Sequence, residues 1–442
     1  MNRFPLFSKT LMIGLLTLLL LIPLGMIESK IGERHNLQLN VQQDIARSAS
    51  GPQVLSGPHL VISYKLRERR TTKDEKGIEK TILTESGPYE AVVSPHTVKI
   101  DGNADVEIRS RGIYQARLFN LHSMVSGNFS VPKGYGIDKP LDDIIPLAAY
   151  IVVNVSDSRG IHNAPLLTLN GAKLEFHPGS VKPLAGNGMH VPLGALAATE
   201  PHSFAFGFPL DLQGMSTLAV SPSANHTEMS LKSSWPHPSF GGSFLPRTRT
   251  IDDQGFSAQW LVTDLARNSA QVSPEQPPVA EAFSVEFVDP VDVYLLSDRA
   301  VKYGVMFVVL VFTAFFMFEV LKSLRIHPMQ YLLVGLVMAM FFLLIISLSE
   351  HIPFVAAYGI SGSACVALIG VYLAGVLKHK KPAIAFSGGV ALLYVVLYGV
   401  LQSEDNALLM GSLVMFAALA AVMILTRRMD WYRLNQTADP QG

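Results

Sequence analysis

An adjacent acid and imidazole, Glu350 and His351, interrupt a long apolar tract within "SLSEHIPF" at 347–354. Inside a bilayer this pair could carry protons, whereas at the bilayer surface it would form a solvated turn. The pair falls between the uncharged runs 328–349 and 352–377, which places it at the end of a helical hairpin. We therefore favour an interfacial turn with solvated side chains, and a proton-linked or partner-binding role is the alternative.

Glu319 is a further acid next to an apolar run. It lies three residues before Lys322, a spacing at which a helix brings the two side chains together as an ion pair. A buried relay carboxylate is the alternative, because ionisable groups within a membrane span are functional candidates by default. No second acid or base lies at matching depth in the apolar runs, which weakens any transporter mechanism that needs an ion relay.

The segment "SSWPHPSFGGSFLP" at 233–246 combines prolines with large aromatic residues. Its three prolines prevent a central strand. A lid that closes one end of a β structure with its aromatic residues buried is the favoured interpretation, and a binding loop is the alternative. In that alternative the candidate partner-binding residues are Trp235, His237, Ser239, Phe240 and Trp260, the last from "GFSAQW" nearby.

Motifs of common enzyme classes are absent from the sequence, which has no H-E-x-x-H, no Walker A pattern and no C-x-x-C. Several histidines lack the spacing of metal ligands and are interpreted as surface or turn residues: His177, His190, His202, His226 and His237. The sequence therefore predicts a non-enzymatic protein with no catalytic residue, cofactor or metal.

Apolar runs dominate the rest of the interpretation. The chain has 442 residues, is 49% hydrophobic and has zero net charge, so a nucleic acid partner is not expected. Uncharged runs occupy 10–27, 303–318, 328–349, 352–377, 382–403 and 406–426. Because a bilayer core needs roughly 20 apolar residues in a helix, we predict six transmembrane helices, with the lipid bilayer as a partner. The first run lacks a small-x-small cleavage site and is predicted to be an uncleaved anchor.

Basic residues orient these helices. One set of helix ends carries ten Lys and Arg residues, whereas the opposite short loops carry Glu350, Glu404 and Asp405 and none. The positive-inside rule then places both termini in the cytoplasm. The predicted organisation is a cytoplasmic N-terminus at 1–9, an anchor helix at 10–27, an exported β-rich domain at 28–302, five helices at about 303–321, 328–349, 352–377, 382–403 and 406–426, and a cytoplasmic tail at 427–442.

The exported stretch reads as strands. Runs such as "HLVISYKL" and "YIVVNVS" alternate or are rich in β-branched residues, and Gly, Pro, Asn and Asp separate them. An antiparallel β-sandwich is the natural class, without disulfides because the only cysteine is Cys365. Two pairs of similar segments predict duplicated strand–turn–strand units: 111–118 with 159–166, and 167–178 with 210–222.

One helix carries a stripe of small residues, Gly359, Ser363 and Ala367, which lets a neighbouring backbone approach closely. Self-association and packing within one chain would give the same pattern.

Eight motifs recur in a known family: "RGIY" (111–114), "SDSRGI" (156–161), "SWPHPSF" (234–240), "GFSAQW" (255–260), "VDPVDVY" (288–294), "RAVKYG" (299–304), "RIHPMQYLLVG" (325–335) and "SLSEHIPFVAAY" (347–358). With them the chain resembles the CreD family of bacterial inner membrane proteins over nearly its whole length. The resemblance implies an association with envelope integrity, with tolerance of certain bacteriocins, and with induction by a sensor kinase and response regulator. It implies no catalytic residue.

Three hypotheses follow for the function. The preferred one is a non-enzymatic inner membrane protein that supports envelope integrity or the stress response, with a periplasmic β domain that binds an envelope protein or peptidoglycan. The second is a small transporter or channel that uses Glu319, Glu350 and His351. The third is an envelope enzyme acting on glycan or lipid, for which the 233–246 segment is the only motive.

Overall fold

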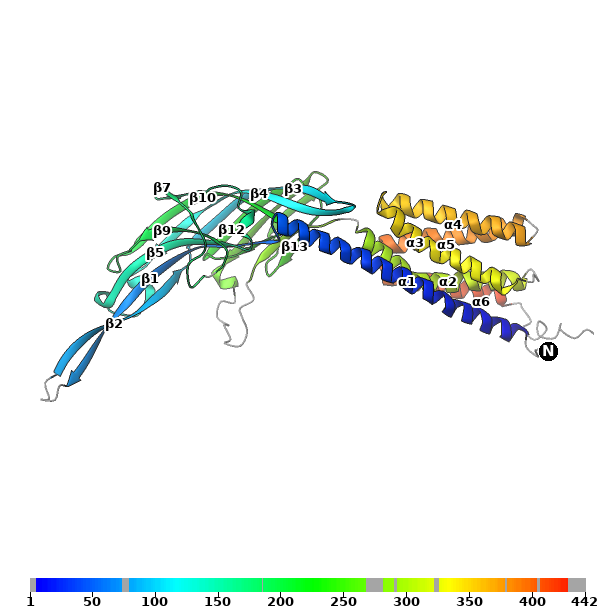
Figure 1. Cartoon of the computed structure of the whole chain (residues 1–442), viewed down its shortest axis with the longest axis horizontal. Coiled ribbons are helices and arrows are strands. Elements are labelled where there is room, and N and C mark those ends of the chain that lie inside the picture. The colour runs from blue at the N-terminus through cyan, green and yellow to red at the C-terminus, as the bar shows by residue number, and fades with distance from the viewer. Residues whose placement is uncertain are drawn as a thin grey trace, which may run out of the picture. The chain divides into compact units, whose positions relative to one another are not determined.

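The computed structural model describes residues 5–73, 79–184, 186–267, 281–289, 292–321, 326–377, 380–403 and 406–427. The chain divides into two compact units (Figure 1): a helical unit from residues 1–39 and 291–442, and a β unit from residues 40–290. Lys322, Glu404, Asp405 and residues 428–442 of the predicted tail lie outside the described ranges.

Six helices of the described chain are long and apolar enough to cross a membrane. They are α1 (Pro5–Ser48), α2 (Val293–Leu321), α3 (Pro328–Ser349), α4 (Phe354–Leu377), α5 (Lys380–Gln402) and α6 (Ala407–Thr426). An apolar helix therefore precedes the β unit and further apolar helices follow it, which confirms the predicted class of membrane protein.

Two helices extend beyond their apolar runs because charged residues pair along the helix instead of ending it. α1 continues from the end of its run near residue 27 to Ser48, and no proline occurs between Pro23 and Pro52. Lys30 and Glu33 pair on this extension at 2.6 Å. The helix thus passes the boundary at residue 28 that the end of the run predicts, since a run marks bilayer depth and not helix length.

α2 begins ten residues before the predicted start at 303. The Oδ1 atom of Asp292 accepts hydrogen bonds from the backbone N–H groups of Tyr294 (2.9 Å) and Leu295 (3.2 Å), which is the geometry of an N-cap. Asp298 and Lys302 then pair one turn apart at 2.7 Å. The "VDPVDVY" motif thus starts this helix.

The described residues of the β unit form two eight-stranded sheets. Sheet one has the order β13-β16-β11-β1-β5-β9-β8, and β2 also pairs with β1. Its strands are β1 (Gln53–Lys73), β2 (Glu79–Val93), β5 (Ile144–Val155), β8 (His177–Pro178), β9 (Gly188–Gly194), β11 (Thr217–Ser221), β13 (Pro238–Gly242) and β16 (Phe283–Phe287). Within the described residues, the part of β1 beyond Leu66 pairs with β2 alone, as a projecting two-stranded ribbon (Figure 1).

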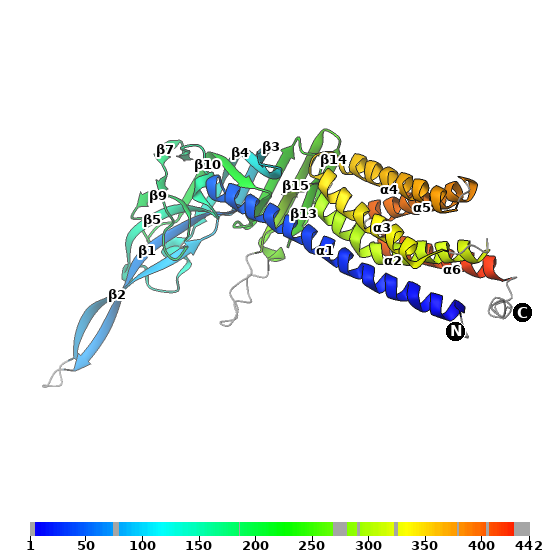
Figure 2. The same ribbon diagram turned by 45° about the vertical axis from the view of Figure 1, so that its right-hand side comes forward.

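Sheet two has the order β14-β15-β12-β3-β4-β10-β6-β7. Its strands are β3 (Thr97–Arg111), β4 (Tyr114–Val131), β6 (Leu166–Leu169), β7 (Ala172–Glu175), β10 (His202–Met215), β12 (His226–Ser233), β14 (Thr248–Asp252) and β15 (Gly255–Thr263). The hairpin of β14 and β15 lies at one end of this sheet (Figure 2).

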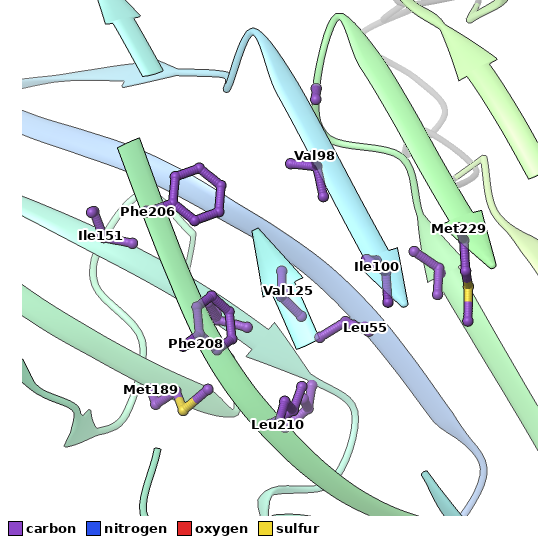
Figure 3. Close-up of a cluster of buried hydrophobic side chains, with 14 of the residues drawn as sticks. Leu55, Val98, Ile100, Val125, Ile151, Met189, Phe206, Phe208, Leu210 and Met229 are labelled. Carbon is purple, nitrogen blue, oxygen red and sulfur yellow. The ribbon is translucent and has the colours of Figure 1, made fainter. Parts of the chain in front are cut away.

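The core lies between the two sheets. Alternate residues of each strand point inward, so that Leu55 and Ile151 from sheet one meet Val125 and Phe208 from sheet two in one buried cluster (Figure 3). Each of these four side chains is at most 2% exposed. The predicted β-sandwich is confirmed, with one addition: each sheet contains one parallel pair, β1 with β11 and β3 with β12.

The predicted duplication of strand–turn–strand units is wrong. Residues 111–118 form the turn between β3 and β4, whereas 159–166 run from a short 3₁₀ helix, η3 (Ser158–Gly160), through a loop into β6. Residues 167–178 contain the β6–β7 hairpin of sheet two and then β8 of sheet one, whereas 210–222 pass directly from β10 of sheet two to β11 of sheet one, without a hairpin. Similar letters therefore fold into different local structures.

α1 ends against a buried polar network of the β unit. Ser50 and Gln53 are 0% exposed, and Gln53 Nε2 donates to Ser50 Oγ (2.7 Å) and to the carbonyl of Asp157 (2.9 Å). The Arg159 guanidinium donates to the Arg47 carbonyl in the last turn of α1, where a cation is favourable. Hydrogen bonds from Arg159 also hold the pKa of Asp157 below its usual value. The "SDSRGI" motif therefore positions the helix end.

Candidate functional site

The aromatic segment predicted as a lid forms an edge strand. β13 lies at the end of sheet one and pairs with β16 in antiparallel register, with Pro238 opposite Phe287. Proline is tolerated at this place because an edge strand leaves one row of its backbone groups without a ladder partner. The prediction that 233–246 supplies no central strand is confirmed.

Three of the five candidates in this region pack into the core. Trp260 is 1% exposed and stacks on Phe283, with ring centroids 5.2 Å apart. The rings of Phe240 and Trp260 meet in an edge-to-face arrangement, with centroids 5.7 Å apart. Trp235 is half-buried, and its Nε1 donates to the carbonyl of Val288 at 3.1 Å. These side chains close one end of the sandwich.

The other two candidates, His237 and Ser239, are exposed. The His237 ring lies next to the half-buried Trp235 ring in an edge-to-face arrangement, with ring centroids 6.3 Å apart. The five candidates thus form two groups. Three aromatic side chains, Trp235, Phe240 and Trp260, pack against the core, and two polar side chains are exposed and could contact a partner.

Sequence reasoning missed the residues that hold the Trp235 ring in place. The Arg117 guanidinium lies 5.7 Å from the centroid of the Trp235 ring and forms an ion pair with Asp289. These two charges are 172 residues apart in the chain. Only the position of Asp289 inside the "VDPVDVY" motif could have singled one of them out.

Replacing Trp235 by phenylalanine is expected to destabilise the protein by about 1 kcal/mol, because the Val288 carbonyl loses its donor and the ring becomes smaller. The exposed His237 is the matched control, and its replacement by alanine should change stability by less than about 0.5 kcal/mol. Denaturant unfolding of the full-length protein in micelles measures both values. Equal values for the two variants would contradict the role of Trp235 as part of the core.

Glu319 is a buried acid of the helical unit with three partners. It is 4% exposed, accepts hydrogen bonds from the hydroxyl of Tyr331 (2.8 Å) and the backbone N–H of Ile326 (2.9 Å), and forms an ion pair with Lys9. These contacts join α1, α2 and α3. The expected partner, Lys322, lies outside the described residues.

Glu350 and His351 form a turn, as predicted, between the end of α3 and the start of α4. His351 is exposed, but Glu350 is not solvated as expected, because only 9% of its side chain is exposed. Its Oε1 accepts from the Tyr294 hydroxyl at 3.2 Å and lies 3.7 Å from Arg34 Nε. Tertiary contacts from α1 and α2 cover it, and no local pattern in the sequence indicates them.

α1 therefore supplies the basic partner of both acids. Lys9 and Arg34 are 25 residues apart, which is about 37 Å along a helix. This length is close to the thickness of a bilayer including part of its headgroup layers, roughly 30–45 Å. Between them α1 packs by Leu20 and Leu24, and Leu20 lies against Gly335 of α3.

The stripe of small residues lines a groove. Gly359, Ser363 and Ala367 of α4, together with Tyr394 and Tyr398 of α5, surround a space of about 540 Å³. Small residues leave room here, and Tyr358 spans the two helices by donating from its hydroxyl to the Tyr394 carbonyl at 2.7 Å. Among the residues that the structure describes, no group of three or more His, Cys, Asp or Glu side chains is placed to hold a metal ion.

The family model described as "Inner membrane protein CreD" matches residues 5–432. A relative of that name from Escherichia coli (strain K12) is 37% identical over 439 residues, which is 98% of this chain and 96% of the relative.

Among solved structures, an M1 zinc metallopeptidase from Deinococcus radiodurans is 10% identical, and the match covers 44% of this chain and 42% of that one. Its TM-score is 0.21, so this likeness carries no argument about fold or activity.

Proposed function

Because the chain belongs to the CreD family of inner membrane proteins, we propose that it is a non-enzymatic envelope protein whose β unit binds a partner in the periplasm. In this proposal both termini are cytoplasmic and the protein supports envelope integrity or the stress response. The distribution of Lys and Arg over the helix ends supports the orientation.

The contacts of Glu319 and Glu350 favour an anchor over a transporter as the role of the helical unit. A relay carboxylate must exchange protons or ions along a path, whereas Glu319 and Glu350 are each held by a cation of α1 and by a tyrosine hydroxyl. Such contacts suit side chains that fasten helices together. The helical unit then serves to hold the β unit at the membrane.

The exposed pair His237 and Ser239 is the proposed contact for the partner. They lie next to the packed aromatic side chains, which core packing and the Trp235–Val288 hydrogen bond keep rigid. A rigid scaffold lowers the entropy cost of recognition. Pro238 between them removes a backbone donor, so a partner would be recognised mainly by side chains and less by an added strand.

In-cell photo-crosslinking tests this proposal. A photoreactive residue at position 237 or 239 of the full-length protein should give a discrete adduct with one envelope protein or with peptidoglycan. Glu228, exposed on β12 of sheet two, is the matched control and should give none. No adduct from either test position, or the same adducts from all three positions, would count against a recognition surface at β13.

A further inference from the structure

Two histidines face each other across neighbouring strands at one end of sheet one. β8 and β9 pair in antiparallel register, which places His177 directly opposite His190. Residues in directly opposite positions point to the same face of a sheet, with Cβ atoms about 4.5–5.5 Å apart. Met189 and Val191, on either side of His190, are 4% and 1% exposed in the core. Both imidazoles therefore lie on the outer face of the sheet, and we call them the His177–His190 pair.

The two rings are placed as ligands of one metal ion would be. Their centroids are 5.8 Å apart and their planes are inclined by 38°. Because a Zn–N bond is about 2.0–2.1 Å long, two imidazoles on one tetrahedral ion have centroids roughly 5 Å apart. A small rotation of one ring closes this difference. His177 is exposed and His190 is half-buried, so an ion can reach the pair from solvent.

The His190 ring is already oriented for coordination. Its Nδ1 lies 2.9 Å from the carbonyl oxygen of Gly179. A carbonyl oxygen only accepts, so Nδ1 carries the proton and the lone pair is on Nε2. Metal-binding histidines almost always donate their other ring N–H in this way, which fixes the tautomer. Tyr150 also packs edge-to-face against this ring, with centroids 5.8 Å apart, and limits its rotation.

We propose that the His177–His190 pair binds a divalent transition-metal ion such as Zn²⁺ or Cu²⁺. Imidazole nitrogen suits these ions, whereas Mg²⁺ and Ca²⁺ take oxygen ligands. In the part of the chain that the structure describes, no further His, Cys, Asp or Glu joins the pair, so water would complete the coordination of the ion. β8 is only two residues long, and a bound ion would fasten this short edge strand to β9.

Pulsed electron paramagnetic resonance of bound Cu²⁺ tests the ligand set, because it detects the remote ring nitrogen of each coordinated imidazole. One equivalent of Cu²⁺ is added to the full-length protein in neutral micelles, purified without a polyhistidine tag. The native protein should show two coordinated imidazoles, and this spectrum should be lost in His177→Gln. Fewer than two imidazoles in the native protein, or an unchanged spectrum in the variant, would overturn the proposal.

Calorimetric titration with Zn²⁺ measures the affinity. His177→Gln should weaken it by about tenfold or more, since one of two protein ligands is lost. His96→Gln is the matched control and should leave the affinity unchanged. His96 and His226 also have ring centroids 5.8 Å apart, but their planes are inclined by 83° and neither ring forms a hydrogen bond within the described residues. Equal losses in both variants, or a loss in His96→Gln alone, would contradict a site at His177.

Thermal unfolding provides a readout that does not depend on Cu²⁺. A ligand of the folded state stabilises it, so saturating Zn²⁺ should raise the unfolding temperature of the native protein more than that of His177→Gln. Mg²⁺ at the same ionic strength should raise neither. An equal rise with Mg²⁺, or an equal response of the variant to Zn²⁺, would show an effect of surface charge and not of this pair.

Discussion

Replacing Glu319 by alanine is expected to lower the free energy of unfolding by about 3 kcal/mol. The change leaves the Lys9 ammonium without its partner and removes the acceptor of the Tyr331 hydroxyl and the Ile326 N–H. Breaking a buried ion pair from one side costs about 3–5 kcal/mol, and the lower end applies because 26% of the Lys9 side chain is exposed. Denaturant unfolding in mixed micelles measures the loss.

Glu350→Ala is the matched control, because its basic partner, Arg34, is 46% exposed and 3.7 Å away. This half-exposed ion pair contributes about 1 kcal/mol or less, and the Tyr294 hydroxyl also loses its acceptor, so the loss should be smaller than at Glu319, which has three partners. Removing both charges of the buried pair, Lys9→Met with Glu319→Gln, should recover part of the stability that either single change loses. If Glu319→Ala were no more damaging than Glu350→Ala, Glu319 would not fasten the helices, and the relay hypothesis would regain its best candidate.

Gly160→Ala is expected to cost about 3 kcal/mol, because the new methyl group has no space. An added Cβ atom would lie 2.2 Å from the Gln213 carbonyl oxygen, 2.4 Å from Gln53 Nε2 and 2.9 Å from Ser50 Oγ. All three atoms belong to the buried polar network at the end of α1, so either the backbone moves or hydrogen bonds break. Unfolding followed by tryptophan fluorescence reports the change in the β unit.

Gly112→Ala provides the comparison within the same "RGI" letters. Gly112 has φ +65° and nothing within 4 Å of an added Cβ atom, so alanine there meets only backbone strain of about 1 kcal/mol. A larger loss at Gly112 than at Gly160 would show that conformation, and not packing, is the reason for glycine in both places.

These two glycines also show what the sequence could predict. Both stand in Arg-Gly-Ile, and the repeated letters suggested a duplicated unit, yet one glycine makes a turn and the other makes room. Local patterns record that a glycine is needed, while the physical reason depends on neighbours that are distant in the chain.

Helices and strands were predictable because lipid and core each impose a period or a length on the sequence. The burial of the aromatic side chains in 233–246 was also predictable, because large apolar rings are stabilised by removal from water. The partners of the acids were not predictable, because Lys9 and Glu319 are 310 residues apart in the chain. Such contacts arise only once the strands and helices have been placed.

Lys9 and Arg34 fix two contact points of α1 at a constant distance along the helix, which matches the thickness of the membrane. A single helix in a bilayer thinner than its apolar length can slide or tilt on its own. α1 is held at two levels, by Glu319 of α2 and by Glu350 directly after α3, so we expect these three helices to adapt to hydrophobic mismatch by tilting together. Lipid composition would then act on the inclination of all three at once.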